Sequence, residues 1–511
     1  MTETARAFWE AQVEATPDAP AILSAGEAWS YAAFDATVNR LANGLRVEGV
    51  RAGAKVAALL PNSVDFLRLQ LALAKLGAIT VPLIAGSTSD EASYVLDHSE
   101  AEILITDAAG GEVVKSKIRM LVGPDPESAG SLLSFLDSGD ESAPPEPGIG
   151  PLSPLAIMYT SGSTGRPKGV VQPSASLGSA GRALTDALGL DARDNILCAL
   201  PFFHTAATHM AFGSAVGCGG TLTLMPRFSR EAFWPVARET GATISYLFPA
   251  QMSILLTAAP SPDDRDNKIR LCFSHVRNEV FCDRFGIDVC PGWAMTETCG
   301  MGTVTRPSNG IPSIGGIGVP YPASARVRIL DPDGREVDVG ERGEIWFAHP
   351  HVMSGYYRDP VNTGRSLRDG WVGSGDIGWL DARGVLHFAG RVKNLIKRSG
   401  ENISGEEVEF TLMGHPAVEE AVVFAVPDEI RTEEVFAVVL VRDGHGTAAE
   451  ELAAWCRERL SAWKTPRYVE LRRGELPRLA NGKVNRSQVI AGADLTAAWQ
   501  DAGMQRAGSR R

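Results

Sequence analysis

The chain has 511 residues, of which 44% are hydrophobic and 22% charged, so its composition is ordinary and it is too long for one hydrophobic core. Its formal net charge of −12 argues against a nucleic-acid-binding surface. We therefore expect two or more domains and small-molecule partners.

Cysteine usage and apolar segments indicate the compartment. The seven cysteines are scattered, odd in number and without a C-x-x-C pair, which argues against a disulfide framework or a zinc site. The N-terminus has no apolar signal core, and the longest apolar region, residues 69–84, is interrupted by Gln70 and Lys75. We expect a cytoplasmic protein without membrane contacts.

Helices and strands alternate over the first part of the chain. The spacing of apolar residues predicts helices over 34–48 and 64–76 and strands over 55–60, 78–83 and 103–106. Such alternation predicts a parallel sheet covered by helices on both faces. The proline-rich stretch 141–154 is typical of a linker.

A loop rich in glycine and hydroxyl residues follows the apolar run 155–158. Residues 159–169 read Tyr-Thr-Ser-Gly-Ser-Thr-Gly-Arg-Pro-Lys-Gly. Glycines let backbone N–H groups approach an anion, hydroxyls donate further hydrogen bonds, and Lys168 adds positive charge. The loop is not a Walker A motif, because Pro167 precedes Lys168 and Gly169 follows it. A phosphate-binding loop is predicted, and a flexible surface loop is the alternative.

The alternation resumes after this loop and then gives way to two other patterns. Strands are predicted over 195–200, 221–225, 243–247, 269–273 and 287–290, with helices such as 229–239 between them. Period-two alternation over 325–347 predicts a β-rich segment. A small α+β domain follows, with helices over 404–413 and 449–460 and strands over 421–426 and 435–441. The predicted domains are residues 1–392 and 393–511.

The loop resembles the phosphate loop of the adenylate-forming superfamily, which includes acyl- and aryl-CoA ligases, luciferases and the adenylation domains of peptide synthetases. Five further stretches are similar to the superfamily's motifs in the same order: residues 201–204, 292–298, 374–376, 390–397 and 476–484. The resemblance spans residues 8–488. It implies an α/β fold with a large N-terminal domain, made of two αβ subdomains and a distorted β-barrel, and a small mobile α+β C-terminal domain.

Taken alone, each stretch has a common structural explanation, such as a helix cap, an Asp turn or a solvated lysine. Taken together, they imply that ATP is bound by Thr160, Ser161, Gly162, Ser163, Thr164, Gly165, Lys168, Ser274, Trp293, Ala294, Thr296, Asp376, Arg391 and Lys483. Catalytic roles are implied for Lys483, Glu297, Thr160 and His204, with Glu297 also the ligand of Mg²⁺. We place His204, Tyr246, His275, Arg277, Gly292 and Met301 in the acid pocket. Lys393 takes the position of the hinge for rotation of the C-terminal domain.

The chain departs from the superfamily's pattern at several positions. Trp293 and Ala294 stand where tyrosine and glycine are usual, and Gly405 stands where proline is usual. The residues Ser-His-Val-Arg-Asn over 274–278 replace a glycine-rich stretch. Three explanations stay open: drift in a surface loop, a pocket reshaped for a compact or strongly anionic substrate, and an inactive paralogue.

The resemblance implies ATP- and Mg²⁺-dependent adenylation of a small, preferably aryl, carboxylic acid. Pyrophosphate is released, and the acyl group passes to coenzyme A. One alternative is a diazotase-like enzyme that activates a non-carboxylic oxyanion such as nitrite and transfers it to an aryl amine without CoA. The other is a non-catalytic nucleotide-binding paralogue. We expect a monomer or homodimer that binds neither nucleic acid nor membrane.

Overall fold

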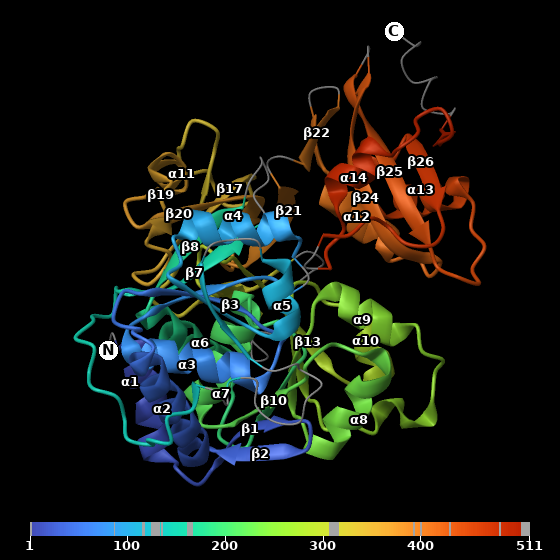
Figure 1. The fold of residues 1–511 in the computed structure, drawn as a ribbon. Coiled ribbons are helices and arrows are strands. Elements are labelled where there is room, and N and C mark those ends of the chain that lie inside the picture. The colour runs from blue at the N-terminus through green and yellow to red at the C-terminus, as the bar shows by residue number, and fades with distance from the viewer. Residues whose placement is uncertain are drawn as a thin grey trace. The chain divides into compact units, whose positions relative to one another are not determined.

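The computed structural model describes residues 3–85, 87–114, 118–123, 133, 136–160, 167–305, 316–391, 394–398, 401–428, 431–479 and 482–501. The chain forms two compact units (Figure 1). The N-terminal unit comprises Met1–Arg328 and Trp346–Ser374, and the C-terminal unit comprises Ile329–Ile345 and Gly375–Arg511. The predicted domain boundary at residue 392 stays a prediction.

The first sheet of the N-terminal unit has nine strands. Their order is β15 (Val319–Tyr321), β14 (Gly302–Val304), β13 (Asp288–Ala294), β12 (Leu271–Ser274), β11 (Ile244–Tyr246), β9 (Asn195–Cys198), β10 (Thr221–Leu224), β1 (Pro20–Ser24) and β2 (Glu27–Ser30). From β13 to β1 every neighbouring pair is parallel. The C-terminal ends of β9, β11 and β12 therefore meet at one edge, where open α/β sheets bind ligands.

The second sheet of this unit has seven strands. Their order is β18 (Gly355–Tyr356), β8 (Lys168–Pro173), β7 (Pro154–Thr160), β4 (Ile79–Pro82), β3 (Lys55–Leu59), β5 (Ile103–Thr106) and β6 (Arg119–Val122). It is parallel from β7 to β6 and antiparallel at β7–β8 and β8–β18. The predicted α/β class with parallel sheets is confirmed.

Helices lie against both sheets (Figure 1). They are α1 (Ala5–Ala15), α2 (Tyr31–Val47), α3 (Val64–Leu76), α4 (Ser89–Ser99), α5 (Ala108–Val113), α6 (Ala175–Leu188), α7 (Gly213–Cys218), α8 (Arg230–Thr240), α9 (Pro249–Leu256) and α10 (Glu279–Phe285). Helix α3 has the predicted bounds because local signals set both of its ends. Ser63 accepts a hydrogen bond from the Phe66 N–H, and Gly77 ends the helix at a φ of 65°.

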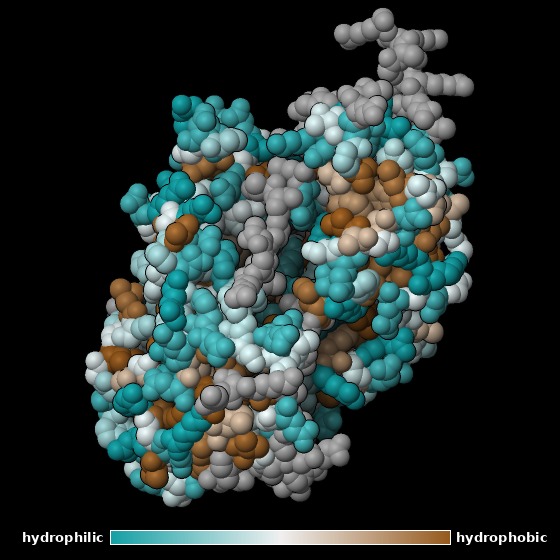
Figure 2. Space-filling model, turned by 45° about the horizontal axis from the view of Figure 1, so that its top comes forward, coloured by the Kyte–Doolittle hydropathy of each residue, from teal (hydrophilic) through white to brown (hydrophobic). Residues whose placement is uncertain are grey.

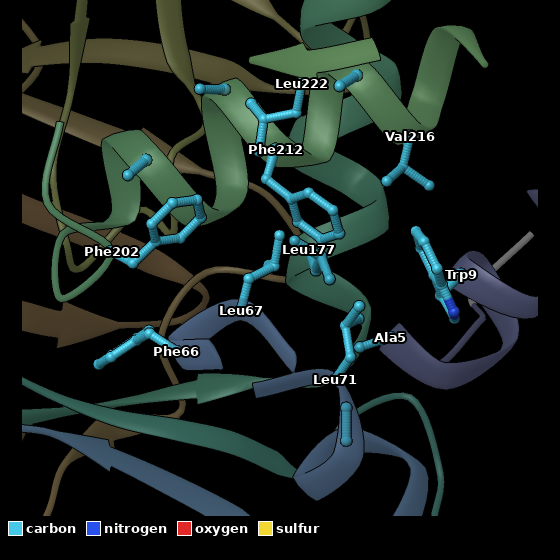
Figure 3. Close-up of a cluster of buried hydrophobic side chains, with 14 of the residues drawn as sticks. Ala5, Trp9, Phe66, Leu67, Leu71, Leu177, Phe202, Phe212, Val216 and Leu222 are labelled. Carbon is cyan, nitrogen blue, oxygen red and sulfur yellow. The ribbon is translucent and has the colours of Figure 1, made fainter. Parts of the chain in front are cut away.

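The main core gathers side chains from helices far apart in the sequence (Figure 3). Leu67 and Leu71 of α3 face Leu177 of α6 and Phe212 of the π-helical segment Ala206–Phe212. These four side chains also line a cavity of about 30 Å³, together with polar groups that include His209. The cavity has room for about one or two water molecules.

His209 is the buried titratable group of this cavity. Its Nε2 lies 2.9 Å from Ser176 Oγ, and its Nδ1 lies 2.9 Å from Thr208 Oγ1. Burial lowers the pKa of His209 to about 3. The imidazole is therefore neutral and holds α6 against the π-helical segment.

The proline-rich stretch 141–154 is not a linker between the units. Arg6 of α1 donates hydrogen bonds to the carbonyl oxygens of Pro144 and Pro145, at 2.9 and 3.2 Å. Asn43 of α2 donates to the carbonyl oxygen of Ser142 at 2.9 Å. The stretch has no regular secondary structure over 141–150, and buried side chains of α1 and α2 satisfy several of its backbone carbonyl groups.

The period-two segment belongs to a five-stranded sheet. It contains β16 (Arg326–Leu330), β17 (Gly343–Ala348), β20 (Trp371–Leu380), β19 (Leu367–Arg368) and β21 (Leu386–Arg391), with helix α11 (Pro360–Ser366) before β19. The β-rich segment is confirmed. Among the described strands this sheet does not close into the barrel that the resemblance implies.

The C-terminal unit has a six-stranded sheet that confirms its predicted α+β class. The strands are β23 (Glu401–Ser404), β22 (Leu395–Arg398), β24 (Val418–Asp428), β25 (Thr432–Val441), β26 (Tyr468–Arg472) and β27 (Trp499–Gln500). The helices are α12 (Gly405–Met413), α13 (Ala449–Arg459) and α14 (Arg486–Ala491). The apolar side chains of β25 point alternately to the two faces of the sheet. Val435, Ala437 and Val439 face α12 and α13 in one core.

No described helix combines the length and apolar character needed to span a bilayer. On the face seen in Figure 2, hydrophobic areas are separated by hydrophilic ones.

All seven cysteines are free thiols, and all except the half-buried Cys218 are buried. Burial raises the pKa of Cys198, Cys272, Cys290 and Cys456 to about 12 and that of Cys218 to about 11.

Candidate active site

The phosphate loop is carried by the antiparallel hairpin of β7 and β8. Thr160 and Lys168 are the last paired residues, so the hairpin brings the two ends of the loop together. Gly169 is required for this pairing, because a Cβ there would lie 2.7 Å from Ile157 Cγ2. The predicted ATP contacts Ser161, Gly162, Ser163, Thr164 and Gly165 lie outside the described residues.

Lys168, Tyr356 and Glu297 form a contiguous polar group. The Lys168 ammonium lies 4.2 Å from the centre of the Tyr356 ring. Tyr356 Oη donates a 2.9 Å hydrogen bond to Glu297 Oε1. Burial, followed by the negative charge of Glu297, raises the pKa of Tyr356, so its hydroxyl stays a donor. A cation and a carboxylate from distant parts of the sequence are thus held beside the loop.

Backbone contacts fix the Thr296–Glu297 turn. Gln172 of β8 donates a 3.1 Å hydrogen bond to the Thr296 carbonyl oxygen, and the Met353 N–H donates to the Glu297 carbonyl oxygen at 2.9 Å. The Met295 N–H donates to Thr298 Oγ1 at 2.9 Å. Glu297 is only 9% exposed, so its carboxylate is largely shielded from water.

A row of aromatic rings crosses the C-terminal ends of β9, β11 and β12. The Phe203 and His204 ring centres are 4.5 Å apart, and the edge of Phe248 meets His204 at 6.4 Å. Phe248 stacks on His275 with ring centres 5.8 Å apart and an interplanar angle of 8°. His275 Nδ1 lies 3.3 Å from the carbonyl oxygen of Gly292. The stretch 274–278, which stands in place of a glycine-rich one, therefore contributes the flat imidazole ring of His275 to this row.

The predicted ATP contacts Ser274, Trp293 and Ala294 lie on β12 and β13, and β13 also carries Gly292 of the predicted acid pocket. Trp293 is buried, with its ring centre 6.2 Å from that of Phe347. Gly292 allows close packing, because a Cβ there would lie 2.5 Å from the Phe273 ring. Ser274 Oγ is buried without a hydrogen-bond partner among the described residues, whereas Ala294 is partly exposed.

Three acid-pocket predictions fall on residues with other contacts. Arg277 forms ion pairs with Glu279 and Asp288. These contacts give no support to an anion-binding role, because two carboxylates already neutralise the guanidinium. Tyr246 and Met301 are 1% and 0% exposed, and Tyr246 Oη is paired with Ser214 Oγ at 3.0 Å. Direct contact of these two residues with an acid stays a prediction.

In the C-terminal unit, Asp376 and Arg391 face each other on β20 and β21. Arg391 Nε lies 3.1 Å from the buried Asp376 Oδ1. Gly375, within β20, has a φ of 70°, and its N–H donates to Glu344 Oε1 at 2.9 Å. A carboxylate and a guanidinium, both predicted ATP contacts, are thus fixed side by side. The hinge prediction at Lys393 lies outside the described residues.

Lys483 lies in a tight loop before α14. The Leu479 N–H donates to the Lys483 carbonyl oxygen at 2.8 Å, and Gly482 has a φ of 78°. Behind the loop, Arg486 pairs with the buried carboxylate of Glu409 and donates to the Val423 carbonyl oxygen at 2.7 Å. Burial raises the pKa of Glu409, and Arg486 opposes this rise. The loop is therefore anchored to α12 and β24.

The donor set suits Mg²⁺ bound together with phosphates. No group of three or more His, Cys, Asp or Glu residues able to hold a metal occurs among the described residues. Mg²⁺ is commonly held by one or two carboxylates plus substrate phosphates. Glu297 is such a carboxylate, and the described residues hydrogen-bond only its Oε1. Glu297 would hold the ion, which would neutralise charge on the phosphates.

Sequence reasoning missed Tyr356, Phe248, Arg486 and Glu409. Phe248 caps α9, and Tyr356 belongs to the two-residue strand β18. Neither occurs in a stretch with periodicity or motif signals. Only pairing of β18 with β8 brings Tyr356 beside Lys168.

Comparison with known proteins identifies this arrangement. The model of the AMP-binding enzyme family matches residues 9–357, and that of the AMP-binding enzyme C-terminal domain matches residues 407–483. Crotonobetaine/carnitine–CoA ligases from Escherichia coli and Shigella flexneri are 32% identical over 485 residues, which cover 90% of this chain and 93% of theirs.

Solved structures agree over nearly the whole length. ATP-bound MatB from Rhodopseudomonas palustris is 28% identical with a TM-score of 0.84, covering 96% of this chain and 98% of its own. The AMP complex of O-succinylbenzoate coenzyme A synthetase from Bacillus subtilis is 27% identical with a TM-score of 0.81, covering 95% and 98%. An anthranilate CoA ligase bound to anthranoyl-AMP shares the fold with a TM-score of 0.86 at 23% identity, covering 97% and 98%.

The chain belongs to the AMP-binding enzyme family of the adenylate-forming superfamily. It is an AMP-forming ligase of the acid–CoA ligase type.

Proposed function

We propose that this enzyme adenylates a small aromatic carboxylic acid with Mg²⁺-bound ATP, releases pyrophosphate and transfers the acyl group to coenzyme A. The aromatic row of Phe203, His204, Phe248 and His275 carries the aryl assignment. Flat ring faces favour a planar guest through offset stacking and edge-to-face contacts, about 0.5–1.5 kcal/mol per pair beyond area burial. Solved relatives include proteins named for O-succinylbenzoate and anthranilate, both aryl acids.

The proposed division of roles follows the charges of the site. Lys168 stabilises charge on the phosphates as the carboxylate attacks the α-phosphorus and pyrophosphate leaves. Glu297 would hold Mg²⁺, which would neutralise further charge on the phosphates. Asp376 and Arg391 bind the ribose, and Trp293 stacks on adenine. Lys483 contacts nucleophile and α-phosphate during the first step. The thiol of coenzyme A then attacks the acyl carbon, and AMP is the leaving group.

A second candidate substrate is a small acid that carries a quaternary ammonium group. The curated relatives at 32% identity are named for crotonobetaine and carnitine. Aromatic faces such as that of Phe248 also attract such cations. The two classes differ in charge and planarity, so one substrate panel separates them.

The test measures CoA-dependent AMP release with benzoate- and cinnamate-type acids, straight-chain acids and a trimethylammonium acid. We expect aryl acids to give the highest kcat/KM. Phe248→Leu and His275→Ala should each lower this value about three- to tenfold for aryl acids and leave the KM for ATP unchanged. Preference for the trimethylammonium acid would assign the second candidate, and equal use of all acids would contradict both.

The nitrite-activating alternative is an outcome of the same experiment. An extra reaction supplies nitrite and an aminoaryl acid without coenzyme A. The variant Arg277→Ala tests whether this guanidinium binds the anion, although it is already paired with Glu279 and Asp288. AMP release with nitrite that Arg277→Ala abolishes would favour the alternative. We expect no such release, and unchanged acid preference in this variant.

A further inference from the structure

Helix α4 contacts both arms of the β7–β8 hairpin. Tyr94 Oη donates a 3.0 Å hydrogen bond to the carbonyl oxygen of Pro167. His98 Nδ1 lies 2.8 Å from Tyr159 Oη on β7. Tyr159 directly precedes Thr160, and Pro167 directly precedes Lys168. One helix thus binds the residue before each end of the phosphate loop.

The two side chains act as one surface of α4. Tyr94 and His98 are four residues apart, and their rings stack with centres 5.4 Å apart. Both meet the Tyr159 ring edge to face, with centres 6.4 and 5.7 Å away and interplanar angles of 83° and 81°. This geometry fixes the orientation of the Tyr159 ring as well as its hydroxyl.

The helix has a local cap at its start and contacts to Arg358 and Tyr357 at its end. At its start, Thr88 and Glu91 form a capping box. At its end, Glu100 pairs with Arg358 at 2.9 Å and accepts a 2.6 Å hydrogen bond from Tyr357 Oη. With this cap and these contacts, the helix can transmit a fixed position to the hairpin that it contacts.

The 2.8 Å contact between Tyr159 Oη and His98 Nδ1 fits a neutral imidazole whose Nδ1 accepts from the hydroxyl, and the opposite direction requires the proton on Nδ1. Burial, followed by the charge of Arg358, lowers the pKa of His98. Asp359 and Glu100 oppose this shift but are the smaller causes. The favoured neutral ring therefore matches a donating Tyr159 hydroxyl.

We propose that Tyr94 and His98 are positioning residues for ATP, which fix the hairpin arms and thereby set Thr160 and Lys168 relative to Glu297. The proposal rests on the proposed function, since it requires Thr160 and Lys168 to contact the triphosphate. Tyr94 and His98 act only through Pro167 and Tyr159. Their loss should therefore affect ATP and not the acid or coenzyme A.

Four variants test this positioning role by steady-state kinetics. Tyr94→Phe removes the hydroxyl and keeps the stacked ring, while His98→Ala removes the acceptor. Each should raise the KM for ATP about three- to tenfold, the range expected for one lost hydrogen bond. His98→Asn retains an acceptor near the Nδ1 position and should restore most of the loss. Tyr468→Phe is the matched control and should leave the KM for ATP unchanged, because Tyr468 lies on β26 of the C-terminal unit, where its ring stacks on Phe436.

Calorimetric titration of each variant with ATP, without acid, gives a second readout. We expect the Kd for ATP to rise with the KM, while Tm stays close to that of the wild type. An unchanged Kd, or equal increases in the KM values of ATP, acid and coenzyme A, would overturn the positioning role. Wild type that binds ATP but activates no acid contradicts the proposed function alone, and the Kd comparison still decides the inference. Wild type that binds no ATP contradicts both.

Discussion

The Tyr356 hydroxyl donates a 2.9 Å hydrogen bond to the Glu297 carboxylate, across 59 positions of the sequence. The same tyrosine belongs to β18, which pairs with the β8 strand that begins at Lys168. The carboxylate proposed to hold Mg²⁺ is therefore tied to the strand that carries Lys168, the lysine proposed to bind phosphate. Movement of one group relative to the other would break a largely buried contact.

Replacing Glu297 by Gln should abolish most adenylation while preserving the fold. The amide oxygen still accepts from Tyr356, but the negative charge that binds Mg²⁺ is lost. We expect kcat for ATP–pyrophosphate exchange to fall about 10²- to 10³-fold, with a higher Mg²⁺ requirement.

Tyr356→Phe is the matched control for this carboxylate. It keeps the ring under Lys168 and the charge of Glu297, so exchange should fall no more than about tenfold. If Glu297→Gln were as active as Tyr356→Phe at every Mg²⁺ concentration, Glu297 would not be the metal ligand.

Lys483→Ala should separate the two half-reactions. A charge-assisted contact made only in the adenylation transition state is worth several powers of ten in rate, at about 1.4 kcal/mol per tenfold. ATP–pyrophosphate exchange should therefore be lost, and transfer from a chemically supplied acyl-adenylate to coenzyme A should persist. Equal damage to both steps would assign a structural role to the lysine.

Arg486→Ala should destabilise the C-terminal unit. It leaves the Glu409 carboxylate buried without its ion-pair partner, a change that costs on the order of 3 kcal/mol. The double variant Arg486→Ala with Glu409→Gln removes the orphaned charge and should recover part of this loss in thermal unfolding. A double variant less stable than the single one would show that the ion pair is not the cause.

His209 should make the stability of the N-terminal unit depend on pH. Burial lowers its pKa in the folded state to about 3, from an ordinary value of 6.5, so the unfolded chain binds the proton first. Its stabilising contribution is complete above about pH 6.5 and falls by about 1.4 kcal/mol per pH unit as the pH decreases toward 3. The free energy of unfolding, measured with urea at several pH values, should depend less steeply on pH for His209→Gln than for the wild type. An identical slope in the variant would exclude this histidine as the source.

Local signals in the sequence predict the fold well where they are strong. Helix α3 has its predicted bounds because Ser63 and Gly77 specify both ends. Strand β13 extends to Ala294, beyond the prediction at 290, because pairing with β14 continues the ladder through residues without an apolar run. Long-range pairing of this kind has no local signal.

In the candidate site, too, residues with a local signal could be predicted and residues placed by long-range contacts could not. Motif residues such as Lys168, Glu297 and Asp376 could be named from the sequence because their types and order resemble a known pattern. Phe248 and Tyr356 could not, because each gains its place only through contacts with residues distant in sequence. The prediction that Arg277 binds the acid did not take into account that Glu279 and Asp288 pair with its guanidinium. Asp288 lies on β13, so this pairing has no local signal.

The covered thiols also determine how motion in this enzyme can be measured. Six of the seven cysteines are buried, and the half-buried Cys218 is held in its protonated, unreactive form at neutral pH. Maleimide dyes react with thiolates, so the native chain should be nearly silent to labelling. Cysteines introduced at two exposed positions, Val47 in one unit and Leu495 in the other, would then carry a donor and an acceptor fluorophore. Energy transfer between them would test whether the units rearrange during a catalytic cycle, without removing any native cysteine.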